Sequence, residues 1–218
     1  MRKHQLPGVF EEKRHMYTRN LIQGTTHFAE STVVEDGVEY REWDPRRSKL
    51  CAGIVKGMSQ TGIREKNVVL YLGASHGYTP SFVSDIIGPD GFMFALDFAP
   101  RVVRDLVYVS ELRSNMSPIL ADANKPETYA HLVSEVDVIF QDISQKNQVE
   151  IFLKNMQFYL KKGGIGLLAL KARSVDTTKD PRIIFDRVKR ELEQATKIVD
   201  QRILDPFEKD HMLFVVKN

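Results

Sequence analysis

In Val68-Val-Leu-Tyr-Leu-Gly-Ala-Ser-His-Gly-Tyr-Thr79 a short apolar run passes through a glycine-containing turn into the start of a helix, and this sequence is the strongest indication of the fold. Such an uninterrupted apolar run is typical of a strand buried on both faces of a parallel sheet. Thr79 can cap the helix, with Pro80 at its first position. Open α/β sheets bind ligands at such turns. The glycines therefore indicate either a cofactor-binding turn or an ordinary tight turn.

From residue 67 onward the chain repeats this alternation of strand and helix. Apolar runs predict strands near residues 67–72, 92–97, 117–121, 136–141, 166–171, 196–204 and 211–217. Turns are predicted at Gly88-Pro-Asp-Gly91 and at Gly163-Gly164, and Pro181 begins an amphipathic helix that ends near Gln194. No helix separates the last two strands, so we expect them to pair antiparallel. The predicted fold class is α/β, with a Rossmann-like, mostly parallel sheet of seven strands of the class I methyltransferase type.

Residues 8–45 have a different pattern. Polarity alternates over 16–19, Val33-Val34 is apolar, and Asp36-Gly37 precedes another short run at 38–40. An Asp-Gly pair between two such runs is typical of a tight hairpin. We therefore predict a small β-rich N-terminal subdomain over residues 1–45 and a methyltransferase domain over residues 46–218.

Composition limits the possible classes of protein. A chain of 218 residues with 42% hydrophobic side chains can bury one sizeable core and a small appendage. There is no apolar run of 18 residues and no signal-peptide h-region in the first ten, so we expect a soluble, cytoplasmic protein. Cys51 is the single cysteine, which excludes an internal disulfide and a multi-cysteine metal site. No metal is expected.

The charge balance is nearly even, with 31 Lys and Arg against 29 Asp and Glu and a net charge of +2. This is too small for the field of a protein that binds nucleic acid unaided. Basic residues cluster at Arg41, Arg46, Arg47 and Lys49. We favour solvated surface charge for this cluster, although a local RNA-binding patch stays open. If the chain acts on RNA, we expect another component to hold the RNA.

Acidic residues stand at the ends of successive predicted strands. Asp97 could accept hydrogen bonds from both ribose hydroxyls of a nucleoside while Phe98 packs on its base, and Asp122-Ala123 could meet an adenine edge. One such carboxylate alone is commonly a turn residue. The turn after the first strand has neither a G-x-G-x-x-G pattern nor a phosphate-binding lysine. A nucleoside without phosphates therefore fits best, which favours S-adenosylmethionine over NAD.

Two opposite charges end the next pair of strands, Asp142 after 136–141 and Lys171 after 166–170. The carboxyl ends of neighbouring strands lie side by side, so these residues form either an active site or a structural salt bridge. His211 opens the last predicted strand.

A series of segments resembles the fibrillarin family, the methyltransferases of box C/D ribonucleoproteins, from about residue 42 to the C-terminus. The segments are Arg47-Ser-Lys-Leu50, Leu70-Tyr-Leu-Gly-Ala-Ser75, Val83-Ser-Asp-Ile-Ile-Gly-Pro-Asp-Gly91, Val136-Asp-Val-Ile-Phe140, Leu170-Lys-Ala172 and Glu208-Lys-Asp-His211. The chain departs from the family pattern at His76-Gly77-Tyr78, at Gln141 and at Ser144-Gln-Lys146. It lacks the Gly- and Arg-rich extension of eukaryotic members and so looks like the short archaeal form.

The resemblance implies a function and a set of residues. It implies guide-directed 2′-O-methylation of rRNA, and of tRNA, with a Nop-family scaffold protein, a kink-turn-binding protein and a box C/D guide RNA as partners. The implied catalytic set is Lys49, Asp142, Lys171 and His211. The implied contacts to S-adenosylmethionine are Gly73, Ala74, Ser75, Gly77, Tyr78, Thr79, Asp97, Phe98, Asp122, Ala123, Asp142 and Gln145.

Methyl transfer needs the ribose oxygen, the methyl carbon and the sulfur nearly collinear, so positioning supplies much of the acceleration. Lys171 is the predicted group that orients or deprotonates the 2′-hydroxyl, because a neighbouring cation or desolvation lowers the pKa of a lysine. Two other functions stay open. One is methylation of a small molecule on the same fold, and the other is a catalytically silent nucleoside-binding subunit.

Overall fold

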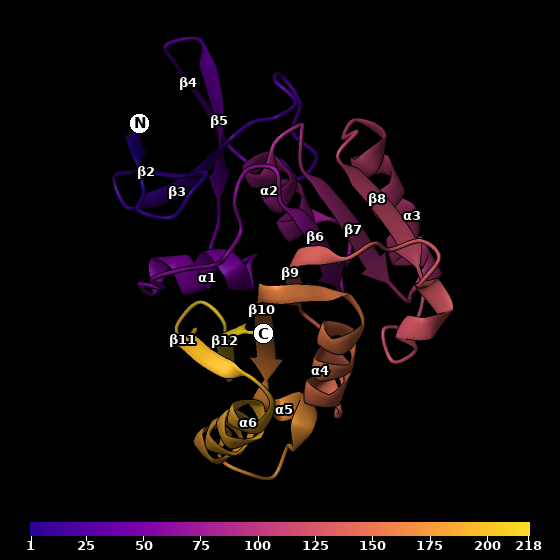
Figure 1. The fold of residues 1–218 in the computed structure, drawn as a ribbon. Coiled ribbons are helices and arrows are strands. Elements are labelled where there is room, and N and C mark those ends of the chain that lie inside the picture. Colours follow the sequence, from indigo (N-terminus) through magenta and orange to yellow (C-terminus); the bar gives the residue numbers. More distant parts are fainter.

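The computed structural model describes residues 1–218, and its main body is a seven-stranded sheet with helices on both faces (Figure 1). The strand order is β11-β12-β10-β9-β6-β7-β8, antiparallel only where β12 pairs with β10 and β11. These strands are β6 (Val68–Leu72), β7 (Phe92–Asp97), β8 (Met116–Leu120), β9 (Val136–Gln141), β10 (Leu160–Lys171), β11 (Lys197–Ile203) and β12 (His211–Lys217). The predicted sheet and its antiparallel hairpin are confirmed.

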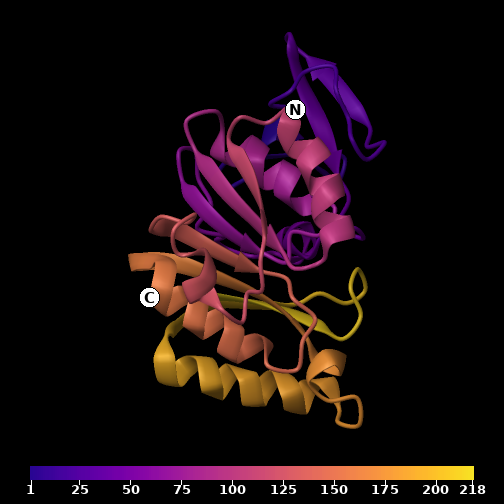
Figure 2. The ribbon, with the colours of Figure 1, turned by 90° about the vertical axis from the view of Figure 1, so that its right-hand side faces the viewer.

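Alternating side chains of the sheet divide the core into two layers. Val69 and Tyr71 pack with helices α1 and α2, whereas Leu70 and Leu72 pack with α4 and α6. Figure 2 shows α4 and α6 next to each other below the sheet. The helices are α1 (Lys49–Val55), α2 (Tyr78–Ile87), α3 (Pro100–Glu111), the 3-10 helix η1 (Pro126–Tyr129), α4 (Gln148–Tyr159), α5 (Ala172–Val175) and α6 (Pro181–Ala195). None of them combines the length and the apolar character needed to cross a bilayer.

Two local expectations were wrong. The turn predicted at Gly163-Gly164 is an irregularity inside β10, where the pairing with β9 shifts register between Leu160 and Ile165. Helix α2 begins one residue before Thr79, and its N-cap is Gly77. The Thr79 hydroxyl instead donates a hydrogen bond of 3.0 Å to the hydroxyl of Ser48. The start of α6 is as predicted, with Asp180 as the cap before Pro181.

The N-terminal region forms a separate antiparallel sheet of order β1-β2-β3-β5-β4. Its strands are β1 (Arg2–Lys3), β2 (Val9–Glu12), β3 (His15–Arg19), β4 (Thr32–Glu35) and β5 (Val38–Trp43). The hairpin predicted at Asp36-Gly37 is present, with φ of 51° and 77° at these two residues. Trp43 stacks on Phe82 of α2 at 5.1 Å between ring centroids. The domain boundary that we place at residues 45/46 lies in the loop between β5 and α1.

A buried ion network joins this N-terminal sheet to α2. Arg41 of β5 pairs with Glu30 at 2.6 Å and with Asp85 of α2 at 2.8 Å, and Arg113 pairs with Asp85 at 2.7 Å. All four side chains are at most 2% exposed. The expectation that Arg41 contributes surface charge was therefore wrong. Its charge is compensated inside the protein.

We predict that Arg41→Ala destabilises the fold by about 3–5 kcal/mol, because it leaves Glu30 buried without a cationic partner and removes one of the two cationic partners of Asp85. Urea unfolding measures the loss. The matched control is Arg19→Ala, an exposed arginine on the same sheet without an ion pair, which should change stability by no more than about 0.5 kcal/mol. Equal stabilities of the two variants would contradict the role given to the network.

Candidate active site

The carboxyl ends of β6, β7, β8 and β9 surround a cavity of about 320 Å³. Parallel strands bring their carboxyl ends to one edge of the sheet, which is where open α/β sheets bind ligands. The residues that line it are Gly73, Ser75, Leu96, Asp97, Phe98, Ala121, Asp122, Ala123, Asp142, Ile143, Ser144 and Gln145. Eight of the twelve predicted cofactor residues are among them. None of the lining residues is a lysine or an arginine, so the cavity has no side-chain cation for a phosphate.

Gly73 allows the ends of β6 and β9 to meet. Its φ is +82°, and a Cβ added there would overlap the backbone carbonyl oxygen of Asp142. The amide of Asp142 donates a hydrogen bond of 2.8 Å to the carbonyl oxygen of Leu72. Only glycine therefore fits between the two strand ends at this position.

The carboxylate of Asp97 is held by the backbone. It accepts hydrogen bonds from the amide of Ser75 at 2.9 Å and from the amide of Ala99 at 3.1 Å. Each oxygen of an ionised carboxylate has a second acceptor position, so Asp97 can accept two further hydrogen bonds. Beside it, the ring of Phe98 is 66% exposed and is available to pack on a planar ligand.

Asp122 is kept ionised by its neighbour. Hydrogen bonds from the side chain and the backbone amide of Asn124, both 2.9 Å, lower the pKa of this carboxyl. The same side-chain amide donates to Gln145 at 3.1 Å, which connects β8 to the loop after β9. The side-chain amide of Asn124 thus connects Asp122, after β8, to Gln145, after β9.

A second group of polar side chains lies beside the cavity. The Lys49 ammonium donates to Asp142 Oδ2 at 3.0 Å, with both side chains about 20% exposed. Burial alone would lower the pKa of Lys49, but the charge and hydrogen bond of Asp142, with the charge of Glu208, raise it. Lys49 therefore remains protonated. The salt bridge considered between Asp142 and Lys171 is not formed, because Asp142 pairs with Lys49 instead.

Lys171 lies at the end of β10, directly opposite His211 in the antiparallel pairing with β12. The fully buried side chain of Gln148 bonds to both backbone polar groups of Lys171. The Gln148 side chain accepts from the Lys171 amide and donates to the Lys171 carbonyl oxygen, each at 3.2 Å. The position of Lys171 is thus set by the start of α4 as well as by the sheet.

His211 is 5% exposed, and its Nδ1–H donates to the carbonyl oxygen of Lys209 at 2.7 Å. Burial lowers its pKa from the ordinary value of 6.5, and the nearby charge of Lys49 lowers it further, against the opposing effects of Lys209, Glu208 and Asp142. At neutral pH the imidazole is therefore uncharged and leaves Nε2 as a hydrogen-bond acceptor.

Comparisons with known proteins identify the family of this chain. The family model described as Fibrillarin matches residues 1–218. The chain belongs to the fibrillarin family. A fibrillarin-like rRNA/tRNA 2′-O-methyltransferase of Pyrococcus horikoshii is 45% identical over 222 residues, covering 100% of this chain and 98% of the relative.

Two solved fibrillarin structures superpose closely, each with a TM-score of 0.90. Aeropyrum pernix fibrillarin in complex with natively bound S-adenosyl-L-methionine is 40% identical and covers 99% of this chain and 96% of its own. A fibrillarin/Nop5p complex contains a chain that is 38% identical and covers 98% of this chain and 99% of its own. The expected methyltransferase-type fold is therefore confirmed.

Four of the cofactor residues implied by the fibrillarin resemblance do not line the cavity. Ala74 and Thr79 are buried in the protein, and Gly77 packs against the side chains of α3. The hydroxyl of Tyr78 accepts a hydrogen bond from the amide of Asp44, and Tyr78 lines a different cavity. The helix start at residue 78 turns these side chains away from the strand ends.

The sequence interpretation did not include four residues that line the cavity. They are Leu96, Ala121, Ile143 and Ser144. Each directly adjoins a predicted residue or another lining residue at a strand end. The predicted strand ends could have indicated these positions. Their side chains could not, because small and apolar residues are common at strand ends and do not by themselves indicate a binding site.

We predict that Gly73→Ala destabilises the protein by about 1–3 kcal/mol more than Gly24→Ala. Both glycines have positive φ, so an alanine at either position costs about 1–2 kcal/mol for adopting the left-handed conformation. A Cβ at Gly24 meets nothing within 4 Å, whereas one at Gly73 displaces the end of β9. Thermal unfolding of the two variants measures the difference, and similar melting temperatures would contradict the close contact of β6 with β9.

Acidification should destabilise the wild type more than His211→Asn. Because the folded-state pKa of His211 lies below 6.5, the unfolded chain binds a proton that the folded chain does not, and stability falls as the pH decreases through about 6.5 toward the folded-state pKa. Asparagine keeps a donor for the Lys209 carbonyl but does not titrate. Chemical denaturation between pH 8 and pH 5 gives both curves, and parallel curves would show that His211 is not held neutral.

Proposed function

We propose that this chain transfers the methyl group of S-adenosylmethionine to ribose 2′-hydroxyls of rRNA and tRNA, as the catalytic subunit of a box C/D guide ribonucleoprotein. The observation that carries the proposal is the junction at Asp142, which both lines the nucleoside-sized cavity and pairs with Lys49. The charge of Lys49 in turn acts on His211, which lies opposite Lys171. The names of the Pyrococcus relative and of the S-adenosylmethionine complex of the Aeropyrum protein support it.

The cavity fits the nucleoside part of this cofactor. Asp97 has free acceptor positions for two ribose hydroxyls, and Phe98 presents an exposed ring for the base. Asp122 and Gln145 supply polar atoms on the opposite wall. The absence of lysine and arginine from the lining suits a group without phosphates. When bound, S-adenosylmethionine supplies a methyl group activated by its sulfonium charge.

The catalytic set limits positive charge near that sulfonium. Lys49 is neutralised by Asp142, and His211 is uncharged. Lys171 is the group that orients the 2′-hydroxyl and accepts its proton. A lysine accepts a proton only as the uncharged amine, so Lys171 acts as the base in that form. Nε2 of His211 can accept a hydrogen bond from the acceptor nucleotide.

The proposed partners are a Nop-family scaffold, a kink-turn-binding protein and a box C/D guide RNA. The Nop5p complex of a fibrillarin supports the first. The net charge of +2, with Arg41 compensated internally, supports dependence on other components for RNA affinity. Guide pairing then selects the nucleotide. The archaeal sources of the relatives support the cytoplasm as the place of action.

Substitutions at two residues should separate cofactor binding from chemistry. Asp97→Ala should weaken S-adenosylmethionine binding by the isolated chain roughly tenfold or more, because hydrogen bonds to a charged acceptor are lost. The affinity of Asp97→Asn should fall between those of the wild type and Asp97→Ala. Lys171→Ala should leave that affinity nearly unchanged, since Lys171 does not line the cavity, and should lower methyl transfer roughly 10²- to 10⁴-fold.

Calorimetry measures the affinities, and single-turnover methylation in the assembled particle measures the rate. Wild-type affinity in Asp97→Ala would remove the cavity as the cofactor site. Equal losses of affinity and rate in Lys171→Ala would make Lys171 a structural residue of the pocket.

A further inference from the structure

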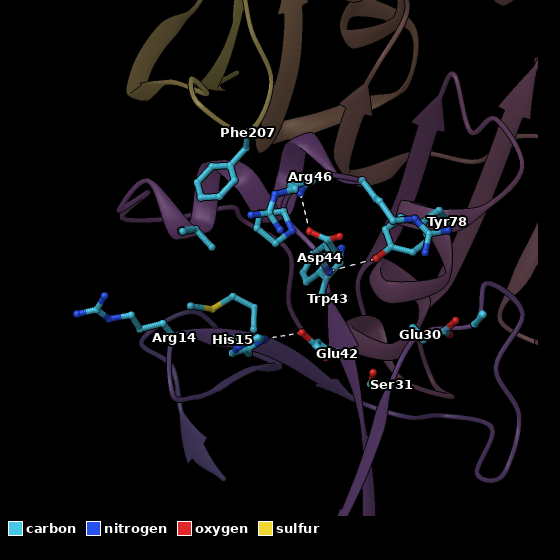
Figure 3. A pocket seen from close by; sticks show the side chains of 15 residues that line it. Arg14, His15, Glu30, Ser31, Glu42, Trp43, Asp44, Arg46, Tyr78 and Phe207 are labelled. Atoms are coloured by element: carbon cyan, nitrogen blue, oxygen red, sulfur yellow. Dashed lines mark hydrogen bonds and ion pairs between the residues drawn. The ribbon is translucent and has the colours of Figure 1, made fainter.

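A second cavity, of about 390 Å³, lies where the N-terminal sheet meets the catalytic domain (Figure 3). Its wall includes Arg14 at the β2–β3 turn, Arg46 and Arg47 in the loop before α1, and Phe207 in the loop between β11 and β12. Figure 3 shows Phe207 and Arg46 on one side of the cavity and Arg14 and His15 on another. None of these residues belongs to the cofactor cavity or to the catalytic set.

This cavity shares two segments with the acceptor side of the active site. The loop with Arg46 and Arg47 leads directly into Lys49, and Phe207 is followed by Glu208, which acts on the pKa of Lys49, and then by His211. The cofactor cavity occupies the other half of the sheet edge, from β9 to β8. An acceptor strand that reaches Lys171 and His211 thus approaches from the side of the second cavity.

The arginines of this cavity are free to bind an anion. Arg14 and Arg46 are exposed and make no ion pair. The Arg47 guanidinium makes none either. It lies 4.1 Å above the ring of Tyr78 and donates to the carbonyl oxygen of Phe28, so its position is fixed.

The same wall has fewer uncompensated carboxylates than arginines. Glu30 pairs with Arg41, whereas the carboxylate of Glu42 is hydrogen-bonded to His15 at 2.5 Å. The carboxylate of Asp44 accepts a hydrogen bond only from the backbone amide of Arg46. Three arginines without ion pairs against the two carboxylates of Glu42 and Asp44 leave the cavity with a surplus of positive charge.

We infer that this cavity binds the target RNA next to the acceptor nucleotide, with Arg46 and Arg14 on phosphates and the ring of Phe207 stacked on a base. The inference rests on the proposed function. An RNA strand continues past the nucleotide that is methylated, so its next phosphates must lie beyond Lys49, where Arg46 is. Unpaired arginines interleaved with an aromatic ring are the side chains that hold single-stranded RNA by charge and stacking.

Salt dependence tests the phosphate contacts in the isolated chain. At low salt, log K for a short single-stranded RNA should fall with log salt concentration, and Arg46→Ala or Arg14→Ala should each reduce that slope by roughly one. Arg190→Ala is the matched control, an exposed arginine without an ion pair on α6, which lies far from the N-terminal sheet in Figure 2, and it should leave the slope unchanged. Equal slopes for all three variants and the wild type would overturn the inference.

Photo-crosslinking tests the position of the RNA in the assembled particle. A target RNA with 4-thiouridine next to the acceptor nucleotide should crosslink to the segments that contain Arg46 and Phe207. Phe207→Ala should reduce crosslinking at least fivefold, and Phe207→Tyr should restore it because the ring remains. Crosslinks confined to other segments would overturn the inference.

Methyl transfer and particle assembly are measured on the same samples. If the wild-type particle crosslinks as expected but methylates no ribose, the proposed function fails while RNA binding in this cavity stands. If Arg46→Ala and Phe207→Ala instead abolish association with the Nop-family protein, and no crosslink forms there in the wild type, the cavity is a protein-binding site and the inference is wrong.

Discussion

The contact between the ends of β6 and β9 fixes Asp142, the residue that joins the two halves of the site. Gly73 packs against the backbone of Asp142, and the Asp142 amide bonds to Leu72, so the carboxylate leaves the sheet at a fixed point. From that point it lines the proposed cofactor cavity and pairs with Lys49. One residue therefore connects the half of the sheet edge that we propose for the methyl donor to the half that we propose for the acceptor.

The acceptor half is set by long-range contacts that do not involve β6. Lys171 and His211 are opposite each other because β12 returns antiparallel to β10, and Gln148 holds the Lys171 backbone from α4. Lys49 comes from α1, which follows the N-terminal sheet. The buried pairs of Arg41 and the stacking of Trp43 on Phe82 fix that sheet to α2, and so fix the loop that leads to Lys49.

Three features of the fold could be predicted because each has a local cause in the sequence. Apolar runs predict the seven strands, the absence of a helix predicts the antiparallel pair at the end, and an Asp-Gly pair predicts the N-terminal hairpin. The strand-end carboxylates were predictable for the same reason, because the carboxyl ends of parallel strands lie at the same edge of a sheet. The burial of Arg41 was not, because its partner Asp85 is 44 residues away and nothing near Arg41 in sequence indicates it.

Other features of the site that the sequence does not show also come from tertiary structure. Tyr78 and Thr79 follow the glycine turn in sequence, but α2 starts early and directs them into contacts with Asp44 and Ser48. Asp142 and Lys171 end neighbouring strands, yet Lys49 arrives from 93 residues earlier and takes the carboxylate. A pattern of strand ends predicts which residues share an edge, but it does not predict which of them pair.

We propose that the acceptor at this edge is a ribose 2′-hydroxyl that a guide selects. The most direct measurement compares two target RNAs in the assembled particle with labelled S-adenosylmethionine, identical except that one has a 2′-deoxy nucleotide at the position opposite the guide's target site. We expect label on the ribose of that nucleotide in the first RNA and none there in the second. Equal labelling of both RNAs would show that the methyl group goes to another atom and would overturn the proposed acceptor.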